Sequence, residues 1–286
     1  MGKIAALLVG LLFTLSAQAG GPGAVRKTIE SSMLVTGWAM IATDGSVTAL
    51  EVDEREKVPE SVLRLVDTAR SQWKFQPVLV DGVARKARAR MSLRIVARKF
   101  DAERYELKLQ GGYFGEEAMT PEERLARGGT IMPVSMKPPF FPLSAAQVGA
   151  RGTVYLVLKV GADGAVEEAF AEQVNLRIVG SEHEMNKLRS LFAKNAMTAA
   201  KAWRFRFPPG YQVAADEFVR VPVDYEFQGE AKPGYGQWNT YVPGPRHRLP
   251  WEKGELDASQ SPDALVAGVL YQAGRGMRLL TPLHPG

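Results

Sequence analysis

The pattern of apolar and polar residues along this chain occurs twice, each time with the spacing of strands first, then of a helix, then of a strand again. Each copy begins with a segment of strand character, leads into an Asp-Gly dipeptide, and continues with a second such segment. Asp-Gly between two apolar segments indicates a β-hairpin, because a type I′ turn needs positive φ at both central residues. The sequence therefore predicts two hairpins, with strands at 34–42 and 47–52 in the first copy and at 153–160 and 166–174 in the second.

Each predicted hairpin is followed by a helical pattern that ends at an aromatic signature. Apolar residues recur at the spacing of one helical face between Val62 and Trp73, and again between Met185 and Trp203. Ser181 and Glu184 form the pattern of a capping box at the start of the second helix. The two signatures are Trp73-Lys74-Phe75-Gln76-Pro77 and Trp203-Arg204-Phe205-Arg206-Phe207-Pro208.

A last strand with strict alternation completes each copy, at 87–95 and at 219–227. The order strand–turn–strand–helix–strand predicts an α+β fold in which one helix packs on a three-stranded antiparallel sheet. We expect the modules at 33–97 and 138–228. Between them we expect a linker at 100–137, with a short helix that begins at the capping box of Thr120. An extended tail rich in Gly, Pro and aromatic residues follows at 229–286.

The first 19 residues have the pattern of a signal peptide. Lys3 provides a positive start, 4–15 is an almost unbroken apolar run, and Ala17-Gln18-Ala19 supplies the small residues of a cleavage site. We expect cleavage after Ala19, because the apolar run is shorter than the roughly 20 residues that span a bilayer. This predicts an exported, periplasmic protein with no remaining transmembrane span. The alternative is a protein anchored in the inner membrane by an uncleaved segment.

Composition narrows the chemistry further. The chain has no cysteine, which excludes disulfides and thiolate metal sites, and its net charge of +5 is too dispersed to predict nucleic-acid binding. The cluster Glu182-His183-Glu184 does not predict a metal site or a catalytic triad, because adjacent helical residues do not share a face. We therefore expect no catalytic residue, no metal and no cofactor. An envelope enzyme with a site assembled between the two modules is the alternative from another functional class.

Several motifs of the second copy together resemble the TonB C-terminal domain family. They are Pro139-Phe140-Phe141-Pro142, the strand start Gly152-Thr153-Val154, the turn Asp163-Gly164, and Trp203-Arg204-Phe205. The first copy keeps the turn at Asp44-Gly45, its own tryptophan signature and Asp81-Gly82, but it lacks the Pro-aromatic-Pro motif. The resemblance covers about 137–227 in the second copy and 33–96 in the first.

The resemblance implies a non-enzymatic periplasmic module that pairs an exposed sheet edge with an extended segment of an envelope protein, such as an outer-membrane transporter. A complete TonB energy transducer also keeps an uncleaved N-terminal helix with a histidine, whereas the first histidine here is His183. A relative without a motor is therefore favoured, and a membrane-anchored transducer is the alternative. Exposed edges also permit a homodimer. The expected partner-binding edge is the last strand of the second copy, with Val219, Val221, Val223, Tyr225 and Phe227.

Basic residues alternate along the last strand of the first copy. Lys86, Arg88, Arg90 and Arg94 have equal parity, so a regular strand places them on one face. The favoured interpretation is a solvated sheet face on which charge prevents edge-to-edge association. The alternative is a contact with an anionic partner, either lipopolysaccharide phosphates, peptidoglycan carboxylates or an acidic protein segment.

Overall fold

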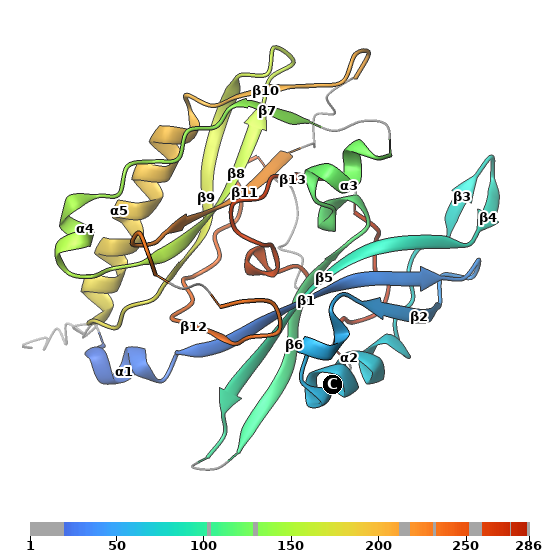
Figure 1. The fold of residues 1–286 in the computed structure, drawn as a ribbon, viewed down its shortest axis with the longest axis horizontal. Helices are drawn as coiled ribbons and strands as arrows, with labels where there is room; N and C mark the ends of the chain where they lie inside the picture. The colour runs from blue at the N-terminus through green and yellow to red at the C-terminus, as the bar shows by residue number, and fades with distance from the viewer. Residues whose placement is uncertain are drawn as a thin grey trace, which may run out of the picture.

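The computed structural model of the 286-residue chain has an α+β fold, built from small antiparallel sheets and few helices (Figure 1). It describes residues 20–101, 104–127, 131–211, 218–230, 233–251, 259–274 and 276–284. The predicted fold class is confirmed. The predicted signal peptide and its cleavage site at Ala19 lie outside the described residues.

The first module is built on a five-stranded antiparallel sheet with the order β12-β1-β5-β6, in which β2 also pairs with β1. Its strands are β1 (Glu30–Ile41), β2 (Val47–Val52), β5 (Ala87–Lys99), β6 (Tyr105–Phe114) and β12 (Asn239–Tyr241). Strands β2 and β12 lie on the same side of β1, one at each end of it. Apolar side chains of β1 and β5, such as Val35 and Leu93, share one core with Val62 and Val66 of helix α2 (Glu60–Arg70).

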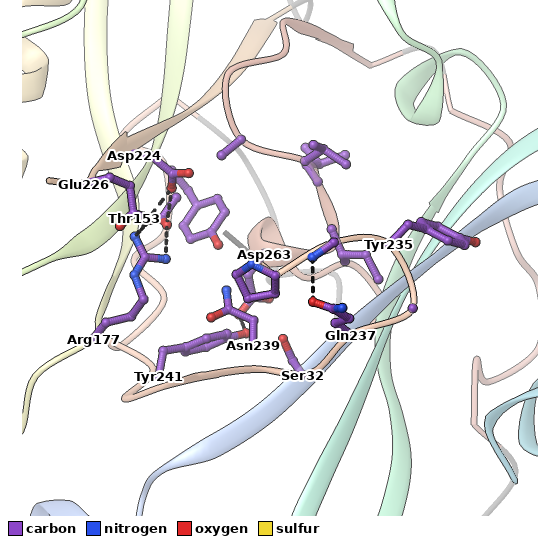
Figure 2. A pocket seen from close by; sticks show the side chains of 18 residues that line it. Ser32, Thr153, Arg177, Asp224, Glu226, Tyr235, Gln237, Asn239, Tyr241 and Asp263 are labelled. Carbon is purple, nitrogen blue, oxygen red and sulfur yellow. Dashed lines mark hydrogen bonds and ion pairs between the residues drawn. The ribbon is translucent and has the colours of Figure 1, made fainter. Parts of the chain in front are cut away.

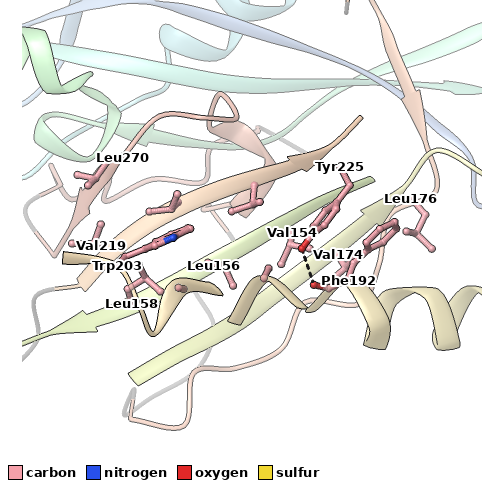
Figure 3. Close-up of a cluster of buried hydrophobic side chains, with 14 of the residues drawn as sticks. Val154, Leu156, Leu158, Val174, Leu176, Phe192, Trp203, Val219, Tyr225 and Leu270 are labelled. Atoms are coloured by element: carbon pink, nitrogen blue, oxygen red, sulfur yellow. Dashed lines mark hydrogen bonds between the residues drawn. The ribbon is translucent and has the colours of Figure 1, made fainter. Parts of the chain in front are cut away.

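The second module has a four-stranded antiparallel sheet with the order β13-β11-β8-β9. Its strands are β8 (Gly152–Val160), β9 (Val166–Leu176), β11 (Phe218–Tyr225) and β13 (Tyr271–Ala273). Helix α5 (Glu182–Ala200) covers one face, where Phe192 packs among Val154, Leu156 and Tyr225 (Figure 3). Alternation along β8 sends its even-numbered side chains into this core, as the sequence predicts.

The two sheets repeat one strand order. The order β2-β1-β5 in the first module matches β9-β8-β11 in the second. Along the chain, α2 lies between β2 and β5, and α5 lies between β9 and β11. The expectation of three-stranded sheets is corrected, because each module gains strands from outside the predicted unit. Strand β6 comes from the region expected as a linker, while β12 and β13 come from the tail.

Short elements connect and flank the two sheets. Both predicted capping boxes are confirmed, at Thr120 with Glu123 and at Ser181 with Glu184. The short elements are α1 (Pro22–Arg26), η1 (Arg55–Lys57), β3 (Val78–Val80), β4 (Val83–Arg85), η2 (Glu116–Ala118), α3 (Pro121–Leu125), β7 (Met132–Ser135), α4 (Leu143–Gln147), β10 (Arg204–Arg206) and η3 (Pro262–Ala264).

Each Asp-Gly turn packs against the aromatic signature of its own module. Gly45 has φ +86° and Gly164 has φ +80°, and a Cβ atom at either position would collide with the carbonyl oxygen of Phe75 or Phe205. The amide of Phe75 donates to the Gly45 carbonyl at 2.8 Å, and Phe205 donates to Gly164 at the same distance. Glycine is therefore required for both its positive φ and its small size.

The tail runs between the two modules (Figure 1). Ala264 and Leu265 of the tail form a small apolar cluster with Tyr113 of β6 and Tyr271 of β13. Around this cluster the sheet faces that carry no helix are largely polar, with buried residues such as Arg94 on β5 and Asn175 on β9. The two modules therefore meet through the tail and through polar side chains.

Candidate functional site

The strand expected as a free partner-binding edge lies inside the second sheet. Strand β11 pairs with β8 along its length and with β13 at Phe218–Arg220, and the Gly268 amide donates to the Pro222 carbonyl. This corrects the expectation of a free edge there, because the tail supplies the neighbouring strand. The side chains of Val219, Val221, Val223 and Tyr225 are buried in the core of the module, and Phe227 stacks on Phe141 with ring centroids 5.0 Å apart.

An extended segment completes the second module next to its aromatic signature. Strand β7 pairs with β10, which contains the phenylalanine of the signature. Two residues beyond β7, the Lys137 carbonyl accepts a hydrogen bond of 2.8 Å from the indole Nε1 of Trp203. We call residues 131–137 the leading segment. It directly precedes the Pro-aromatic-Pro motif of this module.

The first module receives equivalent contacts from a segment close to the end of the sequence, residues 276–284, which we call the closing segment. Leu279 pairs with Phe75 as Pro133 pairs with Phe205. The indole Nε1 of Trp73 donates to the Leu283 carbonyl at 2.8 Å. The spacing between the paired residue and the indole-bound carbonyl is therefore the same in both segments. The closing segment therefore takes the same place in the first module as the leading segment takes in the second.

Further extended segments of the tail pair with other sheet edges. Residues 239–241 form β12 against the start of β1, and Val242 exchanges two backbone hydrogen bonds with Leu176 at the end of β9. Between β12 and β2, the hydroxyl of Tyr235 bonds to both the amide and the carbonyl of Thr36, at 3.1 and 3.2 Å. Both sheets therefore accept added extended backbone along their edges.

In the two larger sheets, the longer edge stretches without a neighbouring strand among the described residues are the outer side of β2 and the first halves of β6 and β9. The stretch of β9 carries exposed Glu167 and Glu168, which lie within 4 Å of the Lys159 ammonium. Charged side chains of this kind disfavour the addition of another strand. The corresponding stretch of β2, Val47–Leu50, carries no charge, and Thr48 and Ala49 are exposed. The open stretch of β6 carries Glu106 and Lys108, which form an ion pair of 3.2 Å, so the uncharged β2 is the most receptive of these three edges.

The basic stripe of β5 lies on the face that carries no helix, as its parity predicts, but half of it is buried. Arg90 pairs with Asp53 at 2.7 Å and with Glu123 at 3.0 Å, and its side chain is 11% exposed. Arg94 is also buried and paired. The expectation that Arg90 and Arg94 are solvated or bind a partner is therefore wrong, because both form internal ion pairs. Lys86 and Arg88 are exposed, and Arg88 pairs with Glu51 and lies 4.2 Å from the ring centroid of Trp38.

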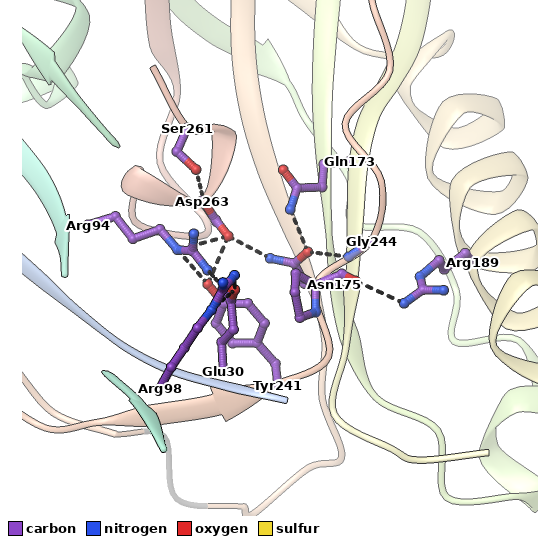
Figure 4. A network of polar contacts seen from close by, with 11 residues as sticks. Glu30, Arg94, Arg98, Gln173, Asn175, Arg189, Tyr241, Gly244, Ser261 and Asp263 are labelled. Carbon is purple, nitrogen blue, oxygen red and sulfur yellow. Dashed lines mark hydrogen bonds and ion pairs between the residues drawn. The ribbon is translucent and has the colours of Figure 1, made fainter. Parts of the chain in front are cut away.

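Arg94 belongs to a buried network that joins the two modules (Figure 4). Its guanidinium pairs with Glu30 at 2.6 Å and with Asp263 of the tail at 3.0 Å. Asp263 also accepts hydrogen bonds from Asn175 of β9 at 2.9 Å and from Tyr241 at 2.8 Å. Burial alone would lower the pKa of Arg94, but the charges of Asp263 and Glu30 raise it, so the arginine stays charged.

A second buried ionic cluster lies between β11, β9 and the linker. Arg220 of β11 is 3.6 Å from Glu172 and 3.8 Å from Glu117, and Arg246 of the tail pairs with Glu172 at 2.7 Å. Sequence reasoning did not identify these residues or Asp263, because the partners are far apart in the chain. Strand parity signals only that Arg220 lies opposite the core face of β11.

Neither a metal centre nor a membrane-spanning helix is found in the described part of the chain. No group of three His, Cys, Asp or Glu residues there is placed to hold a metal ion. No described helix is both long and apolar enough to cross a bilayer. Comparison of the chain with protein-family models, with curated proteins and with solved structures finds no match.

Proposed function

We propose that this chain is an exported, non-enzymatic binding protein of the cell envelope, related to TonB C-terminal domains, which pairs its sheet edges with extended segments of a partner. One observation carries this proposal: extended segments from outside both modules already pair with their sheets, at β12, β13, β7 and the closing segment. A sheet that accepts such segments from its own chain offers the same backbone groups to a partner. The proposed partner is an envelope protein, such as an outer-membrane transporter.

The outer edge of β2 is the proposed contact. Tail segments occupy the edges of β1 and β11, glutamates protect the open stretch of β9, and the charged Glu106 and Lys108 protect that of β6. Strand β2 combines an unpaired edge among the described residues with an uncharged stretch at Val47–Leu50. An added strand would find backbone donors and acceptors there, and pockets for alternate side chains would give specificity.

Photo-crosslinking tests this contact in cells that produce the full chain. A benzoylphenylalanine residue replaces Ala49, which is exposed on β2, and in a control chain it replaces Arg64, whose exposed side chain lies on α2 of the same module. We expect a discrete crosslink to an envelope protein from position 49 and none from position 64. No product at position 49, or the same products at both positions, would refute the proposed edge.

Export is tested separately by the mass of the purified protein. Cleavage after Ala19 predicts a mature chain that begins at Gly20. A chain that retains Met1 in the membrane fraction would instead support the anchored alternative. This result would leave the crosslinking test of β2 unaffected, so the two parts of the proposal can fail independently.

A further inference from the structure

A polar cleft of about 320 Å³ lies between the two modules and the tail (Figure 2). This volume is at the lower end of the roughly 300–1,000 Å³ typical of small-molecule sites. Its walls come from β1, from β8 and β11, and from two stretches of the tail at 233–241 and 263–267. The cleft shares no residue with the β2 edge, so a ligand could bind here whether or not β2 pairs with a partner.

One wall of the cleft is a fixed set of polar side chains. The hydroxyl of Thr153 donates to Asp224 at 2.6 Å, and the guanidinium of Arg177 lies 2.5 Å from Glu226 and 3.9 Å from Asp224. The side chains of Arg177, Asp224 and Glu226 are at most 20% exposed. These contacts hold the carboxylates in place before any ligand arrives, which reduces the cost of binding.

Two further polar groups line the cleft without an internal partner. Tyr155 is only 9% exposed, yet its hydroxyl makes no hydrogen bond with any described residue and is not sealed from solvent. The side-chain amide of Asn239, half-buried on β12, likewise has no hydrogen-bond partner in the described chain. Burial raises the pKa of Tyr155, so its hydroxyl keeps its proton and can donate. Both groups line the cleft and have no protein partner among the described residues, so each can bond to a ligand there.

Apolar side chains form another part of the lining. Leu34 of β1 and Leu265 and Val266 of the tail line the cleft, together with the ring of Tyr235. At the rim, Gln237 accepts from the Gly234 amide at 2.9 Å through its oxygen, which leaves its amino group available. The cleft therefore combines hydrogen-bonding groups with a hydrophobic surface, a combination that suits a ring with hydroxyls at its edge and C–H groups on its face.

We propose that this cleft binds a small, uncharged polyhydroxylated molecule of monosaccharide size. Asp224 and Glu226 accept from ligand hydroxyls, while Tyr155 donates to a ligand oxygen and Asn239 both donates and accepts. The guanidinium of Arg177 is shared by Glu226 and Asp224, and Asp263 is paired with Arg94. An anionic ligand would face carboxylates whose cations are already engaged, so a neutral ligand is favoured.

The test uses full-length protein labelled with ¹⁵N and titrated with glucose, N-acetylglucosamine, myo-inositol and gluconate at millimolar concentrations. We expect at least one neutral probe to shift the amide resonances of Thr153, Arg177 and Asn239, with weaker shifts from gluconate. If no neutral probe shifts these resonances, or if gluconate binds more tightly than glucose, the assignment is wrong.

Two variants show whether binding uses the unpartnered groups. Tyr155→Phe removes only the hydroxyl, and Asn239→Ala removes the amide at a half-buried position. If one variant fails to fold, the other still tests the proposal. We expect each to weaken binding about fivefold, as the loss of one hydrogen bond predicts. Thr198→Ala is the control, because its hydroxyl bonds within α5, to Lys194. Unchanged affinity in both cleft variants would overturn the proposal.

Discussion

The two modules share a strand order and a turn, but they differ in where the chain supplies the segment that completes them. In the second module the indole of Trp203 reaches a carbonyl 66 residues earlier in the sequence. In the first, the indole of Trp73 reaches a carbonyl 210 residues later. The extended segment that pairs with the aromatic signature therefore comes from before the second module but from a distant later part of the chain in the first.

The reason for this equivalence lies in the aromatic signature. A buried tryptophan must satisfy its indole N–H, and the strand after it exposes backbone groups that need a partner. Any extended segment that presents a carbonyl at the right spacing can meet both needs. The leading segment and the closing segment do so with different side chains: the indole-bound carbonyl belongs to Lys137 in the first of these segments and to Leu283 in the second. Backbone geometry, rather than side-chain identity, therefore decides which segment can pair with the aromatic signature.

Among the changes that test this comparison, removal of the closing segment should lower the free energy of unfolding most. A chain that ends after Gly274 loses the buried side chain of Leu283, the half-buried Leu279 and the carbonyl bound to Trp73. The expected loss is roughly 5 kcal/mol, from three apolar side chains, Met277 included, and several hydrogen bonds. Hydrogen exchange read by mass spectrometry should show lost protection in β1 and α2, with β8 and α5 still protected.

Leu280→Ala is the matched control for the truncation, because Leu280 lies in the same segment but is 54% exposed. Its effect should stay within about 0.5 kcal/mol. A synthetic peptide of residues 276–286, added to the truncated chain, should restore protection in the first module. Equal loss of protection in both modules would show that the closing segment does not act locally.

The sequence predicts the repeated units better than it predicts their completion. Hairpins, helices and caps follow from local signals such as Asp44-Gly45 and Ser181, and all are present. The type I′ turns expected in the two hairpins are wrong, because in Asp44-Gly45 and Asp163-Gly164 only the glycine has positive φ. Strands β12 and β13 are three residues long, too short for a periodicity, and they form only because an edge is already there. Parity placed Arg94 on the correct face of β5. It could not show that Asp263, far along the chain, covers that face.

The same limit applies to the cleft. Tyr155 and Asn239 lie in separate strands of different sheets, and no spacing in the sequence relates them. The path of the tail alone brings them to one cavity. The expected partner edge at β11 was wrong for the same reason, since the tail pairs with its first residues.

Asp263→Asn should have the second-largest effect, because it affects the contact between the modules rather than either module alone. The carboxylate is 1% exposed and pairs with Arg94, so its neutralisation leaves that arginine with Glu30 alone. The expected cost is about 3 kcal/mol, at the lower end for a broken buried pair. Glu51→Gln, in the exposed pair with Arg88, should cost less than about 1 kcal/mol. Urea unfolding monitored for each module distinguishes separation of the modules from general destabilisation. Similar costs for the two variants would contradict the conclusion that the buried network holds the modules together.

Substitution of the turn glycines tests whether the two hairpins are equivalent. Gly45→Ala and Gly164→Ala should each cost roughly 3 kcal/mol, since alanine disfavours positive φ and its Cβ meets a carbonyl oxygen. Gly82→Ala is the control: its φ is +75°, but no atom lies within 4 Å of an added Cβ. It should cost only about 1 kcal/mol. The midpoints of urea unfolding give all three values, and a cost for Gly82→Ala equal to the others would remove the steric part of the argument.

The smallest effect is expected from the two indole N–H groups, and it tests the comparison most directly. Trp73→Phe and Trp203→Phe each remove one donor and leave a carbonyl, of Leu283 or Lys137, without its indole partner. Each should cost about 1–2 kcal/mol, with the larger cost at Trp73, because its bond to Leu283 is buried whereas the bond of Trp203 to Lys137 is only partly buried. Loss of exchange protection at Leu280, whose amide bonds to Lys74, should accompany only the change at Trp73. If Trp203→Phe also exposed Leu280, the closing segment would depend on the second module, and the two completions would not be separate.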